Sequence, residues 1–308
     1  MEHFELNILG CGSALPTTRH FPSSQVLNLR NKLYMVDCGE GAQMQFRSMG
    51  LNFNRLNHIF ISHAHGDHCF GLPGLLSTLG MLGKTGELVI HGQPDIEKIF
   101  RPLLDYFCTG MTYSIRFNIF NPNKNELVFE DKTLKVYTIP LKHKVPTCGY
   151  LFEELPKQPH LIREMIDFYQ IPVKQLNEIK KGADFITSGR EIIPNSRLTR
   201  PAEPAKKYAY CSDTIYYHKI IPIIEGADLL YHEATFCEQD LHRTKETGHS
   251  SAKQAAQIAK DAHVKKLIIG HFSSRYPDTN ISLQEAREIF PETILAKEHL
   301  RVLSQNIE

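Results

Sequence analysis

The fold of this chain is decided by one stretch of its sequence, His58-Ile59-Phe60-Ile61-Ser62-His63-Ala64-His65-Gly66-Asp67-His68. Its first four residues form a short, mostly apolar run, which predicts a buried strand. Three histidines and an aspartate follow, so polar side chains lie just beyond the C-terminal end of that strand. Open α/β sheets commonly bind their ligands at such strand ends. The stretch therefore predicts an α/β fold with a ligand site at one edge of a sheet.

Four of the last six residues of that stretch, three histidines and an aspartate, are of the types that make a zinc site. Imidazole nitrogens and carboxylate oxygens are ligands that zinc accepts. Side chains two residues apart on an extended segment point the same way, so His63 and His65 can face one ion. Gly66 permits a sharp turn that brings Asp67 and His68 round to a second ion. One tetrahedral zinc cannot easily take four ligands from so short a segment, so the spacing favours two metals over a loop with incidental histidines.

Strand and helix patterns alternate on both sides of this stretch, which predicts the α/β class. The clearest helix is 251–262, where alanines recur at helical spacing and a serine at position 250 or 251 can serve as N-cap. A second predicted helix covers 43–49. The predicted strands are 4–9, 25–29, 32–36, 87–91, 134–141, 208–211, 228–231 and 267–270.

Three further polar residues follow predicted strands. His143 comes after the strand 134–141, Asp213 after 208–211 and His271 after 267–270. A single histidine or aspartate carries little information, but each of these lies at the same predicted sheet edge as His63. They are therefore candidates to complete two coordination shells.

The composition excludes several classes of protein. With 42% apolar residues and a formal net charge of +1, the 308-residue chain is not expected to be disordered. It has no stretch of 18 or more apolar residues, so no membrane partner is expected, and its first residues lack a signal-peptide pattern. Seven cysteines without a CxxC pair favour a reducing, cytoplasmic compartment. The balanced charge gives no whole-protein sign of a nucleic-acid partner.

The segment 151–207 differs from the rest of the chain because it is rich in proline and carries two helix-like stretches, 161–169 and 173–179. We interpret it as an insertion or arm. On composition alone, an ordinary connecting region with two surface helices is the commoner explanation. The segment contains ten Lys and Arg against eight Asp and Glu, and this net charge of +2 is too small to indicate RNA binding by itself.

The order HxHxDH, then an isolated histidine, an aspartate and a late histidine, resembles the metallo-β-lactamase superfamily. The resemblance implies a four-layer αββα sandwich with two internal sheets and a dinuclear zinc site at one edge. It also implies how two Zn²⁺ per chain are held. One ion takes His63, His65 and His143, the other takes Asp67, His68 and His271, and Asp213 bridges them.

Further motifs look like those of one family in this superfamily, the ribonuclease Z family of tRNA 3′-end endonucleases. Because they are collinear and span the whole length, they imply one lactamase-type domain over residues 1–308, with 151–207 as an inserted arm that grips tRNA. The Gly-Pro pair often found in that arm is absent, and Ile171-Pro172-Val173 stands near its place. The matching motifs are Leu9-Gly-Cys-Gly-Ser-Ala-Leu-Pro16, Asp37-Cys-Gly-Glu-Gly41, Gly71-Leu-Pro-Gly74, His232-Glu-Ala-Thr235, Gly248-His-Ser-Ser251 and Ile269-Gly-His-Phe-Ser-Ser-Arg-Tyr276.

The family resemblance implies a zinc-dependent hydrolase that removes 3′ trailers from precursor tRNA, and it suggests a homodimer. A metal-bridging hydroxide would attack the phosphorus, leaving a tRNA 3′-hydroxyl and a 5′-phosphate on the trailer. We assign Asp67 as the proton acceptor and His249 as the acid for the leaving group, oriented by Glu233. The candidate substrate-binding residues are Arg19, Lys180, Lys181, Ser274 and Arg275.

Two other functions stay open at this point. A dinuclear zinc phosphodiesterase or arylsulfatase-type hydrolase acting on small esters would use the same metal ligands. The motifs at 232–235 and 248–251, together with the arm, disfavour it. An RNA-binding module with a dead metal site is disfavoured because all seven ligand positions are filled.

Overall fold

The computed structural model describes residues 4–303 and 305, so Met1–His3 of the N-terminal stretch lie outside it. The chain divides into two compact units, which are described separately below. Unit 1 comprises the chain up to Glu153 and from Lys206 onward, and unit 2 comprises Glu154–Ala205. Among the described residues, no helix is both long enough and apolar enough to cross a bilayer.

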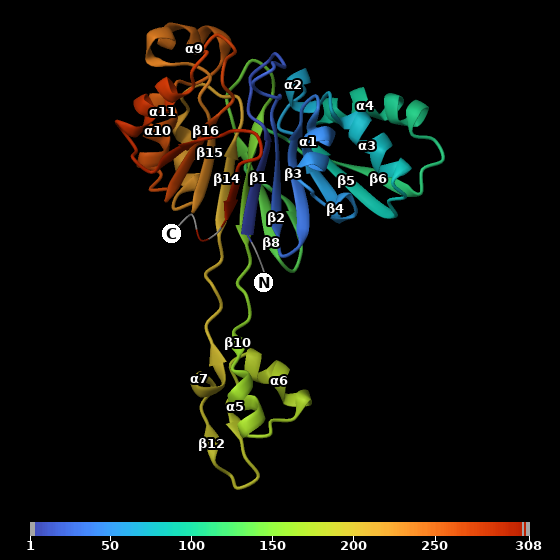
Figure 1. Cartoon of the computed structure of the whole chain (residues 1–308), viewed down its shortest axis with the longest axis vertical. Helices are drawn as coiled ribbons and strands as arrows, with labels where there is room; N and C mark the ends of the chain where they lie inside the picture. The colour runs from blue at the N-terminus through green and yellow to red at the C-terminus, as the bar shows by residue number, and fades with distance from the viewer. Residues whose placement is uncertain (1–3, 304, 306–308) are drawn as a thin grey trace. The chain divides into compact units, whose positions relative to one another are not determined.

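Unit 1 is built on two seven-stranded sheets. Helices α1 and α3–α4 lie outside one sheet, and α10 and α11 lie outside the other, so the layers run helix, sheet, sheet, helix (Figure 1). The first sheet has the order β18 (Arg301–Leu303), β1 (Phe4–Gly10), β2 (Ser24–Leu29), β3 (Lys32–Cys38), β4 (Leu56–Phe60), β5 (Gly86–Gly92), β6 (Tyr113–Ile119). The second has the order β17 (Thr293–Leu295), β16 (Lys266–Gly270), β15 (Leu229–Glu233), β14 (Lys207–Cys211), β9 (Cys148–Glu154), β8 (Leu134–Pro140), β7 (Leu127–Glu130).

The helices of unit 1 are mostly short and connect the strands. Those on the side of the first sheet are α1 (Ala42–Ser48), α2 (Gly66–Cys69), α3 (Leu72–Met81) and α4 (Pro94–Phe107). Those in the second half of the chain are α8 (Ile221–Ile224), α9 (Leu241–Thr247), α10 (Ala252–Asp261) and α11 (Asn280–Arg287). Three turns of 3₁₀ helix cover Phe53–Arg55, His218–Ile220 and Glu238–Asp240.

The first sheet is buried on both faces, and strand periodicity assigns its side chains to two cores. Tyr34 and Val36 belong to the large cluster shared with the second sheet, whereas Met35 between them belongs to the cluster under α1, α3 and α4. Side chains alternate across a strand, so one short apolar run supplies both cores. The strands therefore read as continuous apolar stretches, as a doubly covered sheet requires.

Most predicted elements of unit 1 are confirmed. The hairpin of β2 and β3 turns at Arg30-Asn31, where both residues have positive φ, the conformation of a tight hairpin turn. The predicted helix 251–262 is α10, and the open choice of N-cap is settled, because Ser251 accepts from the Gln254 N–H in a capping box.

Two predicted strands ended too early: the strand predicted at 32–36 continues to Cys38 in β3, and the strand predicted at 228–231 continues to Glu233 in β15. In the structure β15 continues through His232 and Glu233 because these residues pair in parallel with Ile269 and Gly270 of β16. The prediction relied on runs of apolar residues, so it ended the strand before the polar residues His232 and Glu233. The consequence is that Glu233 lies on a rigid strand rather than on a loop.

Unit 2 has a small apolar core of its own, formed by Ile166, Ile171, Ile179, Phe185, Ile193 and Leu198. The arm predicted at 151–207 is longer than this unit because residues 151–153 belong to β9, which pairs with β14. The helix predicted at 161–169 is shorter in the structure, because Leu161 belongs to the strand β10 and the helix α5 begins at Arg163. The elements are β10 (His160–Leu161), α5 (Arg163–Phe168), α6 (Val173–Lys180), β11 (Phe185–Ile186), β12 (Ile192–Ile193), α7 (Asn195–Leu198) and β13 (Thr199–Arg200).

The topology of unit 1 brings several strand ends to one edge. In the first sheet β4 runs parallel to β3 and β5, and in the second sheet β14, β15 and β16 run parallel to one another. Polar segments follow β4, β14, β15 and β16 directly. Carboxyl ends of parallel strands meet at the same edge of a sheet, so each sheet presents polar side chains there.

Candidate metal centre

The segment after β4 carries four of the candidate ligands. His63 and His68 are fully buried, and His65 and Asp67 are partly buried. His65 is the N-cap of α2, so the chain turns here by starting a helix rather than by a left-handed glycine turn. The reason for glycine at position 66 therefore differs from the sequence argument: a Cβ atom there would collide with the Phe70 ring.

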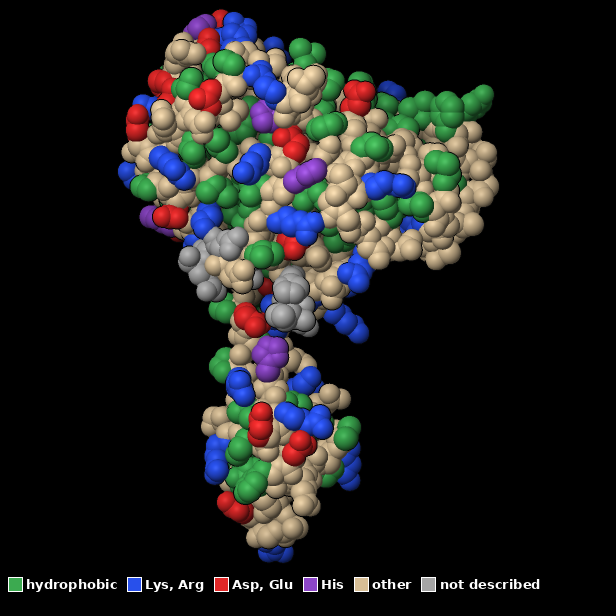
Figure 2. Space-filling view, viewed as in Figure 1, with side chains coloured by type: hydrophobic (Ala, Val, Ile, Leu, Met, Phe, Trp, Pro, Cys, Tyr) green, Lys and Arg blue, Asp and Glu red, His purple; other side chains and the backbone are tan. Residues whose placement is uncertain are grey.

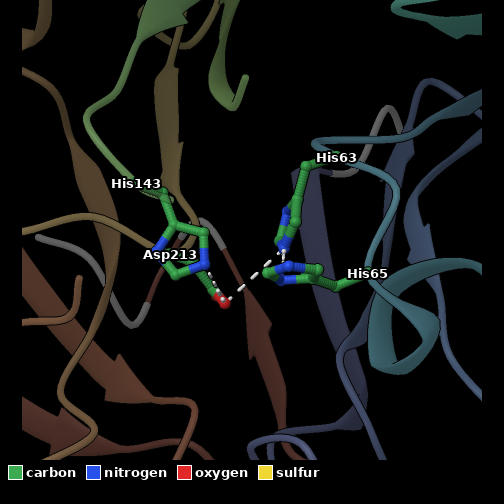
Figure 3. Close-up of side chains that lie close together, drawn as sticks. All are labelled: His63, His65, His143 and Asp213. Carbon is green, nitrogen blue, oxygen red and sulfur yellow. Dashed lines mark hydrogen bonds and ion pairs between the residues drawn. The ribbon is translucent and has the colours of Figure 1, made fainter. Parts of the chain in front are cut away.

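A first ligand group consists of His63, His65, His143 and Asp213, whose ligand atoms all lie within 4.8 Å of one another. His63 Nε2 lies 3.0 Å from His65 Nδ1 and 3.6 Å from Asp213 Oδ2. His143 Nε2 lies 3.8 Å from the same carboxylate oxygen. Figure 3 shows His63 and His65, from one segment of the chain, facing His143 and Asp213, which come from two others.

A second ligand group consists of Asp67, His68 and His271. Asp67 Oδ2 lies 3.5 Å from His68 Nε2 and 3.4 Å from His271 Nε2. The other oxygen of Asp213, Oδ1, lies 3.3 Å from His68 Nε2 and 3.2 Å from His271 Nε2. One carboxylate thus presents a different oxygen to each ligand group.

Contacts at Nδ1 orient several of the histidine rings, as is usual for histidines that bind a metal. The Nδ1 atoms of three of them are engaged by neighbours: His68 with Asp37 Oδ2 at 2.7 Å, His143 with the Gly248 carbonyl at 2.7 Å and His271 with Thr235 Oγ1 at 2.9 Å. Among the described residues, the buried Nε2 atoms of His68 and His143 have no hydrogen-bond partner. A ring fixed through Nδ1, with Nε2 aimed at a shared centre, fits a metal ion at that centre.

The charges of the site also suit a cation. Burial raises the pKa of Asp67 and Asp213, but the neighbouring histidines outweigh burial and hold the pKa of both carboxyls well below the usual range. Burial lowers the pKa of His63 and His143, so these rings are neutral, whereas the carboxylates of Asp213, Asp67 and Asp37 outweigh burial and raise the pKa of His68. Ionised carboxylates and neutral imidazoles are the forms that coordinate a metal.

Asp37 organises the centre from behind, a role that the sequence did not suggest. It accepts hydrogen bonds from the Ser62 N–H at 2.7 Å, the Ser62 hydroxyl at 2.9 Å, the Tyr210 hydroxyl at 2.6 Å and His68 Nδ1 at 2.7 Å. It is fully buried at the end of β3 and has a φ of 55°. In the sequence this aspartate was recognised only as part of the Asp37-Cys-Gly-Glu-Gly41 motif, with no role of its own.

We expect Asp37→Asn to weaken metal retention about 10- to 100-fold, the usual cost of losing a partner that orients a metal ligand. Asparagine keeps the size of the side chain and tolerates positive φ, but its amide places a donor where His68 needs an acceptor. Chelator competition measures the effect. Asp228→Asn is the matched control. Asp228 lies just before β15, and its buried carboxylate accepts a hydrogen bond from Lys265. Equal metal retention in both variants would contradict this role for Asp37.

His249 and Glu233 form a hydrogen-bonded pair beside the ligand groups. His249 Nδ1 lies 2.9 Å from Glu233 Oε1, and Glu233 also accepts from the Thr214 N–H and the Thr235 hydroxyl. Burial lowers the pKa of His249, but the Glu233 carboxylate more than offsets this and raises it to about 9. This pKa keeps the ring protonated at neutral pH. The side chain is 14% exposed, so a bound ligand can contact it.

A cavity of about 460 Å³ opens over the two ligand groups. Its wall includes His65, Asp67, His143, Asp213, His249 and His271, together with Ser13, Ala14, Pro16 and Pro22 from the loop between β1 and β2. The Ala14 N–H donates to Asp67 Oδ2 at 2.8 Å. The loop therefore both lines the cavity and fixes one candidate ligand.

None of the five candidate substrate-binding residues is among the residues that line this cavity, and Lys180 and Lys181 lie in unit 2. The Arg19 guanidinium donates to the carbonyls of Ser274 and Pro277 at 3.1 and 3.0 Å, so it ties two loops together. Arg275 lies 3.8 Å from Asp240 and over the Phe236 ring. Lys180 and Lys181 end α6, and Lys181 pairs with Glu178 at 2.9 Å.

Comparison with known proteins places this geometry in context. A family model described as Anti-Pycsar protein Apyc1 matches residues 4–96. A protein of Parabacteroides distasonis named Ribonuclease Z is 63% identical over 302 residues, covering 98% of this chain and 99% of that protein. The structure of human tRNase Z, short form, superposes with a TM-score of 0.69 at 24% identity, covering 97% of this chain and 98% of that one.

A second solved structure identifies the fold. The metallo-β-lactamase fold protein YhfI from Bacillus subtilis superposes with a TM-score of 0.69 at 20% identity, covering 98% of this chain and all of that one. At these identities the likeness of the two structures concerns the fold alone. It confirms the predicted fold class, a metallo-β-lactamase αββα sandwich.

Proposed function

The chain belongs to the ribonuclease Z family, a family of hydrolytic endoribonucleases, and on that premise we propose that it removes 3′ trailers from precursor tRNA at the candidate metal centre. The observation that carries the proposal is the position of Asp213, whose two oxygens face two separate groups of metal-ligand atoms. Dinuclear centres of this kind hydrolyse phosphodiesters.

We propose that two Zn²⁺ ions occupy the centre. The first ligand group would hold one ion, the second would hold the other, and Asp213 would contact both. The donors are imidazole nitrogens and carboxylate oxygens, which suit zinc. Bound there, the ions would neutralise charge on the phosphoryl oxygens and lower the pKa of the attacking water.

Asp67 is the proposed proton acceptor for the attacking water. Its Oδ2 atom is fixed by the Ala14 N–H and by the nearby His271 ring, so the carboxylate has a defined orientation at the cavity wall. Its pKa, lowered by His68 and His271 against the effect of burial, keeps the carboxylate ionised before the reaction.

His249 is the proposed acid. Attack by water forms a P–O bond while the bond from phosphorus to the ribose 3′-oxygen breaks, and the departing oxygen needs a proton. His249 binds Glu233 through Nδ1, which leaves Nε2 as its other donor, and the ring lines the cavity. The products would be a tRNA 3′-hydroxyl and a trailer with a 5′-phosphate.

We expect His249→Ala to lower kcat on precursor tRNA about 10²- to 10⁴-fold, the usual contribution of a general acid. A nitrophenyl phosphodiester should be cut at nearly the normal rate, because its leaving group departs without a proton. His242→Ala, which removes an exposed histidine on α9, is the control. Equal losses on both substrates would rule out the role of His249 as an acid.

The test of the function is cleavage of a 3′-extended precursor tRNA with both product ends mapped. Cleavage at the 3′ end of the tRNA body with the stated termini supports the proposal. Absence of cleavage together with fast turnover of a small diester would instead indicate a hydrolase of small esters.

Unit 2 is the proposed tRNA-binding arm of the single lactamase-type domain. Eight Lys and Arg stand against seven Asp and Glu within 154–205. Figure 2 shows the basic side chains of this unit interspersed with acidic ones on the face in view. Such a surface suits recognition of an RNA by its shape and backbone at a few basic points, such as Lys180 and Lys181, rather than by one basic patch.

The proposed assembly is a homodimer in the cytoplasm. Ile99, Leu103, Tyr106 and Phe107 are exposed on α4, and a group of apolar side chains on one helix favours an interface. All seven cysteines are buried and unpaired, which suits a reducing compartment.

A further inference from the structure

A third group of metal-ligating side chains, the Cys11 cluster, is distinct from the two ligand groups and consists of Cys11, His20 and Glu298. Cys11 directly follows β1, and His20 lies in the loop before β2. Glu298 lies between β17 and β18, where the chain passes from the second sheet to the first. Nothing in the proposed reaction uses these side chains.

The ligand atoms of the Cys11 cluster lie close together, with the sulfur and the ring nitrogen facing different oxygens of Glu298. Cys11 Sγ lies 3.4 Å from His20 Nδ1 and 3.6 Å from Glu298 Oε1, and His20 Nδ1 lies 3.1 Å from Glu298 Oε2. In a tetrahedral zinc site the usual bond lengths separate sulfur from nitrogen or oxygen by about 3.5 Å and nitrogen from oxygen by about 3.3 Å. The three separations are close to these edges, and a rotation of the Glu298 carboxylate would present one of its two oxygens to the ion.

The arrangement differs from a nucleophilic triad. In a triad the nucleophile and the carboxylate bind opposite nitrogens of the histidine ring. Here the thiol and the carboxylate both approach the same atom, His20 Nδ1. A neutral ring has one lone pair or one proton at that nitrogen, and a cation bound there satisfies the thiolate and the carboxylate together.

We propose that Cys11, His20 and Glu298 bind a zinc ion in a structural site. Binding forms a sulfur–metal bond, and the thiol proton leaves to solvent. The charges of the thiolate and the carboxylate then balance the ion. Cys11 is fully buried, whereas the side chains of His20 and Glu298 are 23% and 17% exposed, so a water molecule can supply the fourth ligand.

The position of this site gives it a structural role. Gly12 lacks a Cβ atom that would lie 2.9 Å from that of His20, which lets the histidine approach. The Phe21 N–H donates to Glu298 Oε1 at 2.9 Å, and the Phe272 N–H donates to the Cys11 carbonyl at 3.0 Å. The ion would therefore fasten both ends of the 12–21 loop, which lines the cavity, to the segment between β17 and β18.

Cobalt substitution tests the proposal without reference to RNA cleavage. A thiolate bound to Co²⁺ gives a charge-transfer absorption in the near ultraviolet, whereas the nitrogen and oxygen donors of the candidate metal centre give none. We expect the Co²⁺-loaded chain to show this band and the Cys11→Ser variant to lose it. Cys69→Ser is the matched control and should keep it, because Cys69 is also a buried thiol but adjoins His68.

Two results would overturn the third site: a Co²⁺-loaded chain with no thiolate band, or a band that survives Cys11→Ser. Should Cys11→Ser fold poorly, Glu298→Gln retains the thiol and removes one ligand. Elemental analysis of that variant should show the loss of about one zinc per chain relative to the unaltered chain. The same metal content in both would also refute the site, and neither result bears on whether the enzyme cuts tRNA.

Discussion

Asp213→Ala is expected to reduce cleavage of precursor tRNA by more than about 100-fold, because loss of a ligand costs more than loss of a partner that merely orients one. Each oxygen of Asp213 lies within 4 Å of ring nitrogens in a different ligand group. Without this carboxylate the two groups share no ligand, and the buried imidazoles lose their common anion. The metal bound at the candidate metal centre should fall well below two ions per chain. Steady-state kinetics and elemental analysis measure the two effects.

Measuring the affinity for precursor tRNA distinguishes a variant that has lost its metal from one that has not folded. No residue of the described part of unit 2 belongs to either ligand group, so Asp213→Ala should leave precursor affinity largely intact. His65→Ala and Asp67→Ala are expected to behave in the same way, since each removes a ligand from one group only. Near-normal cleavage by Asp213→Ala, or a parallel loss of tRNA affinity, would argue against this account.

Removal of unit 2 is expected to have the opposite signature: affinity for precursor tRNA falls at least about tenfold, equivalent to about 1.4 kcal/mol, while turnover of a small diester changes little. The two strands that flank unit 2 pair with each other, so they can be joined directly once unit 2 is removed. Glu153 of β9 and Lys207 of β14 are antiparallel partners, so an Asn-Gly turn between Glu154 and Lys206 closes a hairpin. Unit 2 has its own apolar core, so its loss leaves both cores of unit 1 complete.

Point variants refine that test. The double variant Lys180→Ala, Lys181→Ala should lessen the salt dependence of binding, because each lost phosphate contact reduces the slope. Lys253→Ala, on α10 in unit 1, is the control. Unchanged precursor affinity after removal of unit 2 would show that the arm does not bind tRNA, whatever the metal centre does.

The sequence predicted the architecture because its signals are local. The run His58–Ile61 marks a strand, the alanines of 252–259 mark a helix face, and Ser251 caps that helix. Each pattern lies within a few residues and reflects the period of one element. Where polar residues occupied a strand, as at His232 and Glu233 in β15, the same reasoning ended the strand early.

The sequence by itself determined the fold class and the chemical types of the candidate ligands, because strand periodicity and ligand chemistry are both carried by neighbouring residues. Only the tertiary structure decided which distant side chains meet. Asp37 orients His68 from 31 positions away, and Cys11 meets Glu298 across 287 positions. These contacts depend on strand order and on where the chain passes between the two sheets. No local pattern encodes that order, so the contacts of Asp37 and of the Cys11 cluster became visible only in the folded chain.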